Sequence, residues 1–353
     1  MTAIVYPSFW RGKRVLITGH TGLPGSWTAL RLHRMGAEIS GFALPPADQP
    51  GLYALARIGD LVKGVAGDLR DAEAVRRAVV ASKPQIVLHM AGLRRAETAR
   101  RAPLEAFAVN ATGTAHVLGA LREAHWLEAA LIVTTGPFYG EGAPGRAFLE
   151  ADPPGADDPL QASLSAADLF TTAMARTFFT PARVAIGRAR LGSLIDGGEF
   201  AEGRLVADIC RAAAAGKPVL LRQPHALRTW RHVLDGVGFC LAYAQALAQG
   251  RNPPAALNLG AASDDMVSVA EFTLALQKAL GARPDWRPAD GHSPHASRAP
   301  ALDGARARAA LGFRDRLVGH AAVKAIADWR LALARGEDMR AFSLRSIADH
   351  ERP

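Results

Sequence analysis

The chain has 353 residues, of which 49% are hydrophobic and 21% charged, so it can form a large core and does not have the composition of a disordered protein. The net charge is +9, but only 6 of the 42 basic residues are lysine and the arginines are scattered among alanines, which argues against nucleic-acid binding. No segment approaches the ~18 apolar residues of a membrane span, and residues 1–14 do not resemble a signal peptide, so we expect a cytoplasmic protein without a membrane partner. Cys210 and Cys240 are too few for a disulfide framework or a thiolate metal site.

Strands and helices are predicted to alternate through the first half of the chain. Buried strands are expected at residues 13–18, 38–43, 62–66, 85–90 and 130–134, and helices at 27–35, 71–81, 110–124 and 163–177. Residues 140–159 are rich in Gly, Pro and Asp and are predicted to form a loop across the mouth of the site. This alternation favours an α/β fold with a Rossmann-type, doubly wound parallel sheet.

The regular alternation weakens after residue 191, where residues 205–215 and 237–248 are the clearest helices. We therefore expect a dinucleotide-binding domain over residues 1–190. Residues 191–353 are expected to form mainly a smaller, mixed substrate lobe, with some segments returning to the Rossmann sheet.

Three glycines, Gly19, Gly22 and Gly25, lie directly between the first predicted strand and the first predicted helix. In this context the first glycine permits a tight turn, the second lets the backbone approach a pyrophosphate, and the third allows the helix to pack closely on the strand. The helix N-terminus would then face the phosphates. The loop predicts a nicotinamide dinucleotide site, and its other expected members are His20, Thr21 and Leu23.

The sequence leaves the choice between NAD and NADP open. The second strand ends in Ser40, Gly41 and Phe42, with neither an acid for a ribose hydroxyl nor an adjacent arginine for a 2′-phosphate. We take NAD as the expected cofactor. Asp68 and Leu69, after the third strand, are placed to border the adenine, although Asp68 could instead cap the next helix.

Several segments resemble the extended short-chain dehydrogenase/reductases, and within them the CDP-glucose 4,6-dehydratases. The matching segments are FWRGKRVLITGHTGLPGSW (9–27), GDLRD (67–71), VLHMAG (87–92) and VNATGT (109–114), followed by residues 224–235, 257–260 and 336–350. The resemblance implies a nucleotide-sugar ligand, further cofactor contacts at Ala91, Gly92 and Asn110, and a homodimer formed through the helices at 110–124 and 163–177. Dehydratases of this family oxidise C4 of the sugar with NAD, eliminate water across C5 and C6, and return the hydride to C6.

The catalytic positions implied by the resemblance are only partly filled. Thr135 occupies the position of the hydroxyl that polarises the substrate, but Gly136 and Pro137 stand where the dehydratases have Asp and Lys. The family pattern DPYSNSK matches residues 158–164, which places Leu160 on the tyrosine and Leu164 on the lysine. Moreover, none of the four tyrosines in the chain has a lysine four residues later.

Leucine has no titratable group, and each lost acid/base group typically removes a factor of ~10² to 10⁴ in rate. We therefore expect a protein without the usual dehydratase chemistry, acting as a pseudoenzyme or partner subunit. The alternative is an active nucleotide-sugar dehydratase or epimerase in which Thr135 works with a relocated acid/base, for which Tyr139 is the candidate. An apolar patch built from Leu160 and Leu164 would favour the first interpretation.

On the substrate side, Arg190 fits the family's RAGN segment and Ser193 replaces its Asn. Arg228 lies in the run HALRTW, and its guanidinium is suited either to a pyrophosphate or to an ion pair. His295 lies near the family's HPH segment and is the last expected substrate contact.

Overall fold

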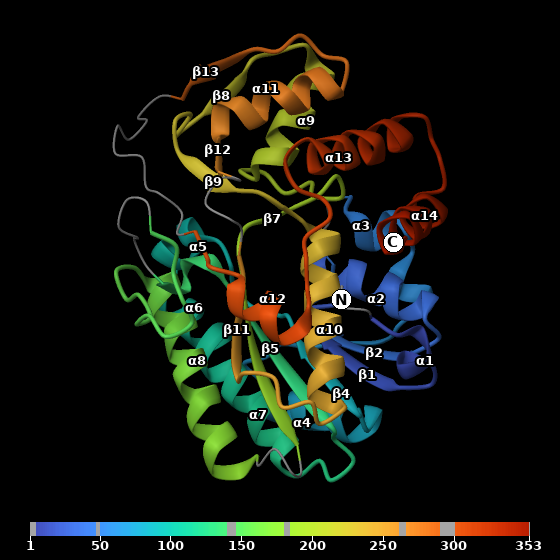
Figure 1. The fold of residues 1–353 in the computed structure, drawn as a ribbon, viewed down its shortest axis with the longest axis vertical. Coiled ribbons are helices and arrows are strands. Elements are labelled where there is room, and N and C mark those ends of the chain that lie inside the picture. The colour runs from blue at the N-terminus through green and yellow to red at the C-terminus, as the bar shows by residue number, and fades with distance from the viewer. Residues whose placement is uncertain are drawn as a thin grey trace.

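The computed structural model describes residues 5–46, 50–139, 146–179, 184–260, 266–289 and 301–352. Within them, a seven-stranded sheet has the order β11-β6-β5-β4-β1-β2-β3, and every neighbouring pair in it is parallel (Figure 1). Its strands are β1 (Arg14–Thr18), β2 (Glu38–Ala43), β3 (Lys63–Ala66), β4 (Ile86–His89), β5 (Ala129–Thr135), β6 (Ala185–Leu191) and β11 (Ala256–Leu259). The predicted fold class is confirmed, and each of the five predicted strands is present within one residue of its expected ends.

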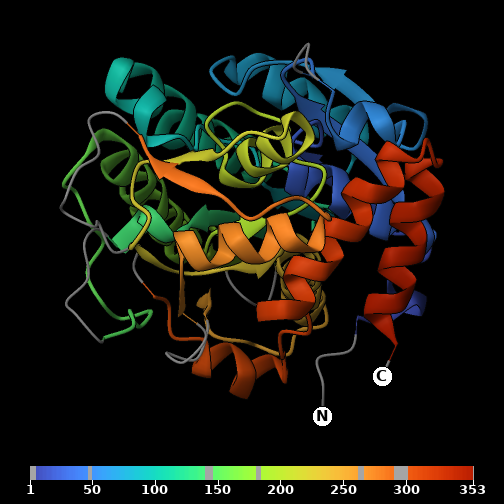
Figure 2. The same ribbon diagram turned by 90° about the horizontal axis from the view of Figure 1, so that it is seen from above.

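Helices cover both faces of the sheet because its strands are apolar on both sides. On β1, Val15 and Ile17 join one core and Leu16, which points the opposite way, joins the other. The first core is covered by α2 (Leu23–Arg34) and α10 (Val233–Ala248), and the second by α4 (Ala72–Ser82), α7 (Gly113–Arg122) and α8 (Pro159–Phe178). The C-terminal helices α13 (Gly319–Ala334) and α14 (Met339–Glu351) lie side by side, with α14 packed on α2 (Figure 2).

Four helices differ from their predicted bounds. α2 and α10 each begin four residues earlier than predicted, at Leu23 and Val233, and α7 and α8 differ for identifiable reasons. α8 begins at Pro159 rather than residue 163, because the Asp158 carboxylate accepts a hydrogen bond from the Gln161 amide and Pro159 suits a first turn. The predicted helix at 110–124 consists of a π-helical turn (Ala108–Thr112) that continues into α7. Short helices occur at α1 (Pro7–Trp10), α3 (Leu52–Leu55), α5 (Ala96–Arg101), α6 (Pro103–Phe107) and α12 (Ala305–Leu311), with 3-10 turns at Ile58–Asp60 and Gly136–Tyr139.

A smaller lobe stands above the carboxyl edge of the sheet (Figure 1). It contains the strand pairs β8 (Val219–Leu221) with β13 (Trp286–Pro288) and β9 (Leu227–Thr229) with β12 (Met266–Ser268), together with α9 (Leu205–Ala215) and α11 (Val269–Ala279). Its own apolar core includes Ile209, Phe272 and Leu276. The chain enters it through β7 (Leu194–Ile195), which pairs with β10 (Arg231–His232), and later returns to the main sheet as β11. No helix among the described residues is long and apolar enough to cross a membrane.

His89, at the end of β4, makes the fold sensitive to acid. Its ring is buried, with Nδ1 2.7 Å from the Thr18 hydroxyl and Nε2 3.0 Å from the Thr114 hydroxyl, and burial lowers its pKa to about 3. The unfolded chain takes up this proton near pH 6.5, so the stabilising difference is complete above that value. It is lost progressively as the pH falls toward about 3.

We predict that His89→Gln flattens the fall of stability with acid by about 1.4 kcal/mol per pH unit between those two values. Urea unfolding of the wild type and the variant at a series of pH values measures the slope. His33→Gln, on the exposed face of α2, is the matched control and should leave it unchanged. Equal slopes for the wild type and His89→Gln would contradict the prediction.

Candidate functional site

The predicted glycine loop joins β1 to α2 in a form that only glycine permits. Gly19 has φ +78°, and a Cβ on it would lie 2.8 Å from the backbone of Ala91. A Cβ on Gly25 would lie 2.2 Å from the carbonyl oxygen of Gly19, so α2 could not approach the loop as it does. Gly22 is the N-cap of α2 and supplies no side-chain acceptor. The first amide groups of the helix are thus left without a side-chain cap, as a pyrophosphate site requires.

His20 covers the sheet beside this loop. A Cβ on Gly41 of β2 would lie 2.5 Å from the imidazole Cγ, and one on Gly64 of β3 would lie 3.0 Å from Nε2, so the ring lies across both strands. The ring is buried, its Nδ1 has no hydrogen-bond partner in the described structure, and burial lowers its pKa. Thr21 donates to the carbonyl oxygen of Leu44, and Leu23 packs partly buried against the core beneath α2.

Asp68 and Leu69 lie in the segment that follows β3. The Asp68 carboxylate lies 2.5 Å from the guanidinium of Arg70, and this hydrogen bond lowers the pKa of Asp68. It does not cap α4, because Asp71 accepts the hydrogen bonds from the first-turn amides. Leu69 is buried against α7, where a Cβ on Gly113 would approach it to 2.7 Å. Contact of Asp68 and Leu69 with adenine stays a prediction.

Asn110 holds the segment that follows β4. Its Oδ1 accepts from the Leu93 amide at 2.8 Å, and its Nδ2 donates to the Leu93 carbonyl at 2.9 Å and to the Ser163 hydroxyl at 2.9 Å. A Cβ on Gly92 would lie 3.0 Å from Asn110 Oδ1. The Ala91 amide donates to Thr18. Asn110 therefore positions the crossing after β4, and its side chain is engaged within the protein.

Thr135 and Arg94 carry polar atoms without partners at the ends of β5 and β4. The Thr135 hydroxyl and the Arg94 Nη1 are both buried and have no hydrogen-bond partner within the described residues. Such atoms are costly to bury unless a ligand satisfies them. The sequence does not single out Arg94, because nothing in its spacing distinguishes it from Arg95. Only the packing of the chain buries its Nη1 atom.

Tyr139 belongs to a buried network rather than to an open pocket. Its hydroxyl donates to Asn258 Oδ1 at 2.7 Å and accepts from Arg190 Nη1 at 2.6 Å, and its ring stacks on Phe148. Arg190 also lies 3.0 Å from the carboxylate of Asp168 on α8. Burial, the largest influence, raises the pKa of Tyr139 in spite of the neighbouring guanidinium. Both the occupied hydroxyl and the raised pKa work against Tyr139 as a base.

Leu160 and Leu164 lie on successive turns at the start of α8. Both are buried in a cluster with Ala99 of α5 and Ala106 of α6, and Leu93 packs against it from the segment after β4. The positions that the resemblance assigns to tyrosine and lysine therefore form a small apolar core. A charged lysine at 164 would be unpaired within this cluster.

The predicted substrate residues are dispersed. Arg190 is buried in the Tyr139 network, whereas Ser193 is exposed after β6. Arg228 on β9 donates to the carbonyl of Leu227 and to Gln223, and it has no carboxylate partner in the described part of the chain. His295 lies outside the described residues.

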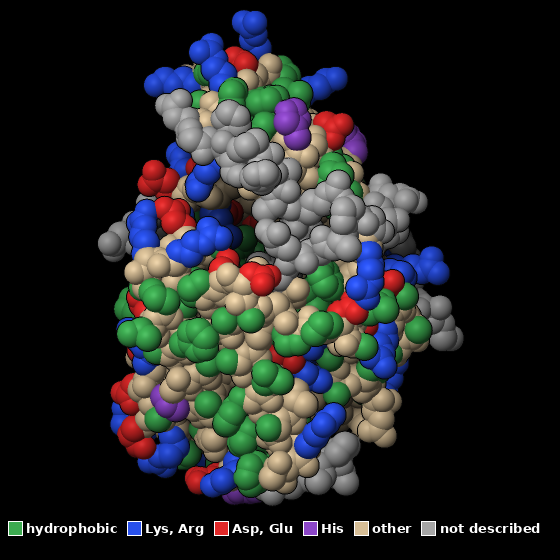
Figure 3. Space-filling view, turned by 90° about the vertical axis from the view of Figure 1, so that its left-hand side faces the viewer, with side chains coloured by type: hydrophobic (Ala, Val, Ile, Leu, Met, Phe, Trp, Pro, Cys, Tyr) green, Lys and Arg blue, Asp and Glu red, His purple; other side chains and the backbone are tan. Residues whose placement is uncertain are grey.

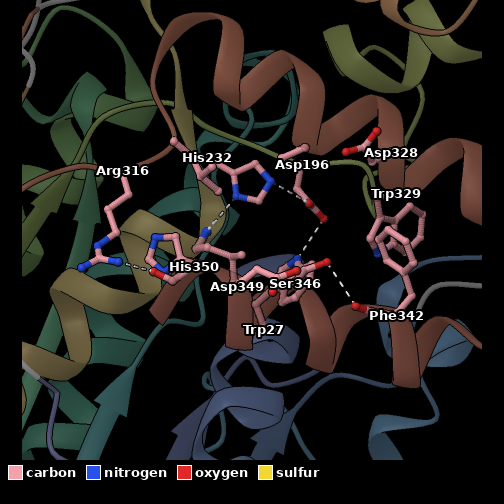
Figure 4. Close-up of a pocket in the computed structure, with 13 residues that line it drawn as sticks. Trp27, Asp196, His232, Arg316, Asp328, Trp329, Phe342, Ser346, Asp349 and His350 are labelled. Carbon is pink, nitrogen blue, oxygen red and sulfur yellow. Dashed lines mark hydrogen bonds and ion pairs between the residues drawn. The ribbon is translucent and has the colours of Figure 1, made fainter. Parts of the chain in front are cut away.

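A cavity of about 540 Å³ is lined by residues of α2, α10, α13 and α14 (Figure 4). The Trp27 indole donates to Asp196 at 2.8 Å, and the other oxygen of this carboxylate lies 3.4 Å from His232 Nε2. Nearby, His350 Nε2 lies 2.8 Å from the buried carboxylate of Asp235. The first two contacts connect α2 to the start of α10 through Asp196, and the third connects α10 to α14.

The parallel sheet, its helical layers and the loop at α2 define an α/β protein of the Rossmann type. The model of the NAD-dependent epimerase/dehydratase family matches residues 15–260. The chain is also 32% identical to CDP-glucose 4,6-dehydratase of Salmonella typhimurium over 97% of both chains. The protein belongs to the NAD-dependent epimerase/dehydratase family.

Solved structures share the fold at lower sequence identity. UDP-glucose 4-epimerase of Stenotrophomonas maltophila, with bound NAD and formylated UDP-arabinopyranose, is 22% identical and gives a TM-score of 0.78 over 92% of this chain and 99% of that one. The NAD complex of UDP-glucose 4-epimerase from Thermus thermophilus is 23% identical, with a TM-score of 0.75 over 89% and 98%. These likenesses support the architecture.

We predict that Tyr139→Phe lowers the free energy of unfolding by about 1–3 kcal/mol, because it leaves Asn258 Oδ1 without its donor. Urea unfolding measures the change. Tyr6→Phe, at a residue that is 46% exposed, is the control and should be neutral. Unchanged stability in Tyr139→Phe, accompanied by loss of a catalysed reaction, would instead support Tyr139 as a relocated base.

Proposed function

We propose that this protein binds NAD and a nucleotide sugar but lacks the usual dehydratase chemistry, and acts as a pseudoenzyme or partner subunit. The observation that carries the proposal is the apolar cluster around Leu160 and Leu164, which leaves no acid/base pair at the start of α8. Full-length similarity to a CDP-glucose 4,6-dehydratase makes a cytidine-linked sugar the first ligand to test. Bound NAD would supply a hydride acceptor, but a sugar hydroxyl would still need a base to take its proton.

The loop geometry supports the dinucleotide half of the proposal. Gly19, Gly22 and Gly25 adopt the close backbone arrangement that suits a pyrophosphate, and the buried Thr135 hydroxyl offers a donor or acceptor to a ligand at the end of β5. Because Ser40, Gly41 and Phe42 at the end of β2 include neither a carboxylate nor an arginine, NADP remains an alternative to NAD. The Thr135 hydroxyl and the Asn110 side chain are compatible with ligand binding alone, and they do not require that the protein catalyses a reaction.

An active enzyme with a relocated acid/base is the competing function. Thr135 supports it, because its free hydroxyl could orient a sugar. Tyr139 weighs against it, because its hydroxyl is already bonded to Arg190 and Asn258. We therefore favour the inactive interpretation.

Purified protein denatured and analysed by mass spectrometry should release NAD or NADP, and incubation with CDP-glucose should give no 4-keto product. The Salmonella typhimurium relative, assayed in parallel, shows that the assay works. Gly22→Ala should fold, because its Cβ would meet only Gly19 O, at 3.4 Å. It should lose the nucleotide, because a side chain here would block the close backbone approach that a pyrophosphate needs. Gly119→Ala, with open space around its Cβ, is the control. A 4-keto product would show that a base has moved, and failure to bind any dinucleotide would overturn the proposal.

The partner that we propose is a second copy of the chain, joined through α6 and α8. These packed helices expose Leu104 (85%), Leu169 (62%) and Phe170 (40%), an arrangement that is unfavourable for a monomer. Figure 3 shows hydrophobic side chains gathered over the lower part of this face. The resemblance noted in the sequence implies a dimer contact through residues 110–124 and 163–177, so α8 is common to both contacts whereas α6 is added here from its exposed Leu104.

We predict that the double substitution Leu169→Asp and Phe170→Asp converts a dimer into a monomer of unchanged fold, because it buries two charges in the contact. Light scattering after size-exclusion chromatography measures the mass. Leu220→Asp, at an exposed residue of the smaller lobe, is the control and should leave the dimer intact. A wild-type protein that is monomeric would refute the dimer.

A further inference from the structure

Arg94 is partly buried and carries a positive charge that no carboxylate among the described residues neutralises. Its Nη2 donates to the carbonyl oxygens of Met90 at 3.1 Å and Val133 at 2.9 Å, while its Nη1 is buried without a partner. No ion pair to a carboxylate is found for it within the described residues. Burial lowers its pKa to about 10, so the guanidinium is still charged at neutral pH.

The groups that act on this charge come from two other parts of the fold. The Cys240 thiol approaches from α10, and burial raises its pKa to about 12, so it is neutral at physiological pH. Arg204, before α9, also repels this charge, although it is itself paired with Glu199 at 3.6 Å. The surroundings therefore do not offset the cation. A buried charge of this kind is normally paired or satisfied by a ligand.

The position of Arg94 in the sheet identifies the ligand group that it would face. The strand order reverses between β1 and β4, and in such sheets a dinucleotide lies across the carboxyl edge with one half on each side of this point. The β2 side conventionally takes the adenine ribose, which leaves the nicotinamide half to β4 and β5. Arg94 bridges the carbonyl of Met90, just after β4, and that of Val133 in β5, which both lie one residue beyond the last pair between β4 and β5.

We propose that Arg94 makes the cofactor site select the reduced dinucleotide, NADH, over NAD⁺. The inference rests on the proposed function, because it requires a nicotinamide dinucleotide in this site. The oxidised nicotinamide ring carries a positive charge and the reduced ring is neutral, so only NAD⁺ is repelled by the guanidinium. Arg94 would thereby hold the bound couple toward its reduced form and make occupancy respond to the ratio of NADH to NAD⁺.

A purely structural role for Arg94 makes a different prediction. If the side chain only satisfies the carbonyls of Met90 and Val133, removing its charge should lower stability and weaken both cofactor forms alike. If it discriminates charge, the effect should fall on NAD⁺ alone, and affinity for this form should rise when the charge is removed.

The test equilibrates the protein with equal concentrations of NAD⁺ and NADH, removes free nucleotide, and measures the bound ratio after denaturation. If the nicotinamide ring binds within about 10 Å of the guanidinium, repulsion of the charged ring predicts an excess of bound NADH of about tenfold or more. Arg94→Met should bring the ratio close to one, whereas Arg94→Lys, which keeps the charge, should preserve most of the excess. Arg95→Met is the matched control, because Arg95 donates instead to the carbonyl of Glu202.

Equal binding of the two forms by the wild type would overturn the inference and leave the proposed function intact. An Arg94→Met protein that keeps the wild-type ratio would do the same. Binding of neither form would instead reject the proposed function itself. Should Arg94→Met fail to fold, as judged by thermal melting, Arg94→Gln replaces it as the uncharged variant, since it can still donate to the two carbonyls.

Discussion

The contact between Gly25 and the carbonyl oxygen of Gly19 sets the geometry on which the candidate site depends. A Cβ at residue 25 would approach that oxygen to 2.2 Å, so any larger side chain would push α2 away from β1. The close approach directs the helix N-terminus at the carboxyl edge of the sheet. Because all seven strands in that sheet are parallel, the segments that follow β3, β4 and β5 also meet there. Most of the candidate cofactor groups depend on this shared edge.

The same edge carries polar groups at the end of β5 and after β4, but apolar side chains at the start of α8. Thr135 still ends β5 with its hydroxyl available, and Asn110 still fixes the segment after β4. By contrast, α8 carries Leu160 and Leu164 at the positions that the resemblance assigns to tyrosine and lysine, and alanine and leucine side chains surround them. An apolar cluster of this kind stabilises the helix packing but cannot take up or release a proton.

Most charged side chains around Tyr139 form ion pairs and hydrogen bonds that connect one secondary-structure element to another. Asp168 on α8 lies 2.6 Å from Arg188 and 3.0 Å from Arg190, which ties the helix to β6. Arg190 then reaches Tyr139, and Asn258 connects that phenol to β11. Removing one member leaves the others buried and unsatisfied, so the network favours a rigid support. Arg94 differs from it, because its charge has no carboxylate partner among the described residues.

The sequence by itself determined the fold class, the strand positions and the glycine loop, because these follow from local periodicity and from the special conformations of glycine. It also showed that no tyrosine is followed by a lysine at the spacing of the family. Only the tertiary structure decided that Tyr139 and Arg190 are bonded to each other and that Asp71 rather than Asp68 caps α4. It also decided that the Nη1 of Arg94 is buried without a partner, while Arg95 donates to the carbonyl of Glu202. The reason is that burial and hydrogen-bond partners arise between segments far apart in the chain, such as Tyr139 and Asn258, and no local pattern encodes those distances.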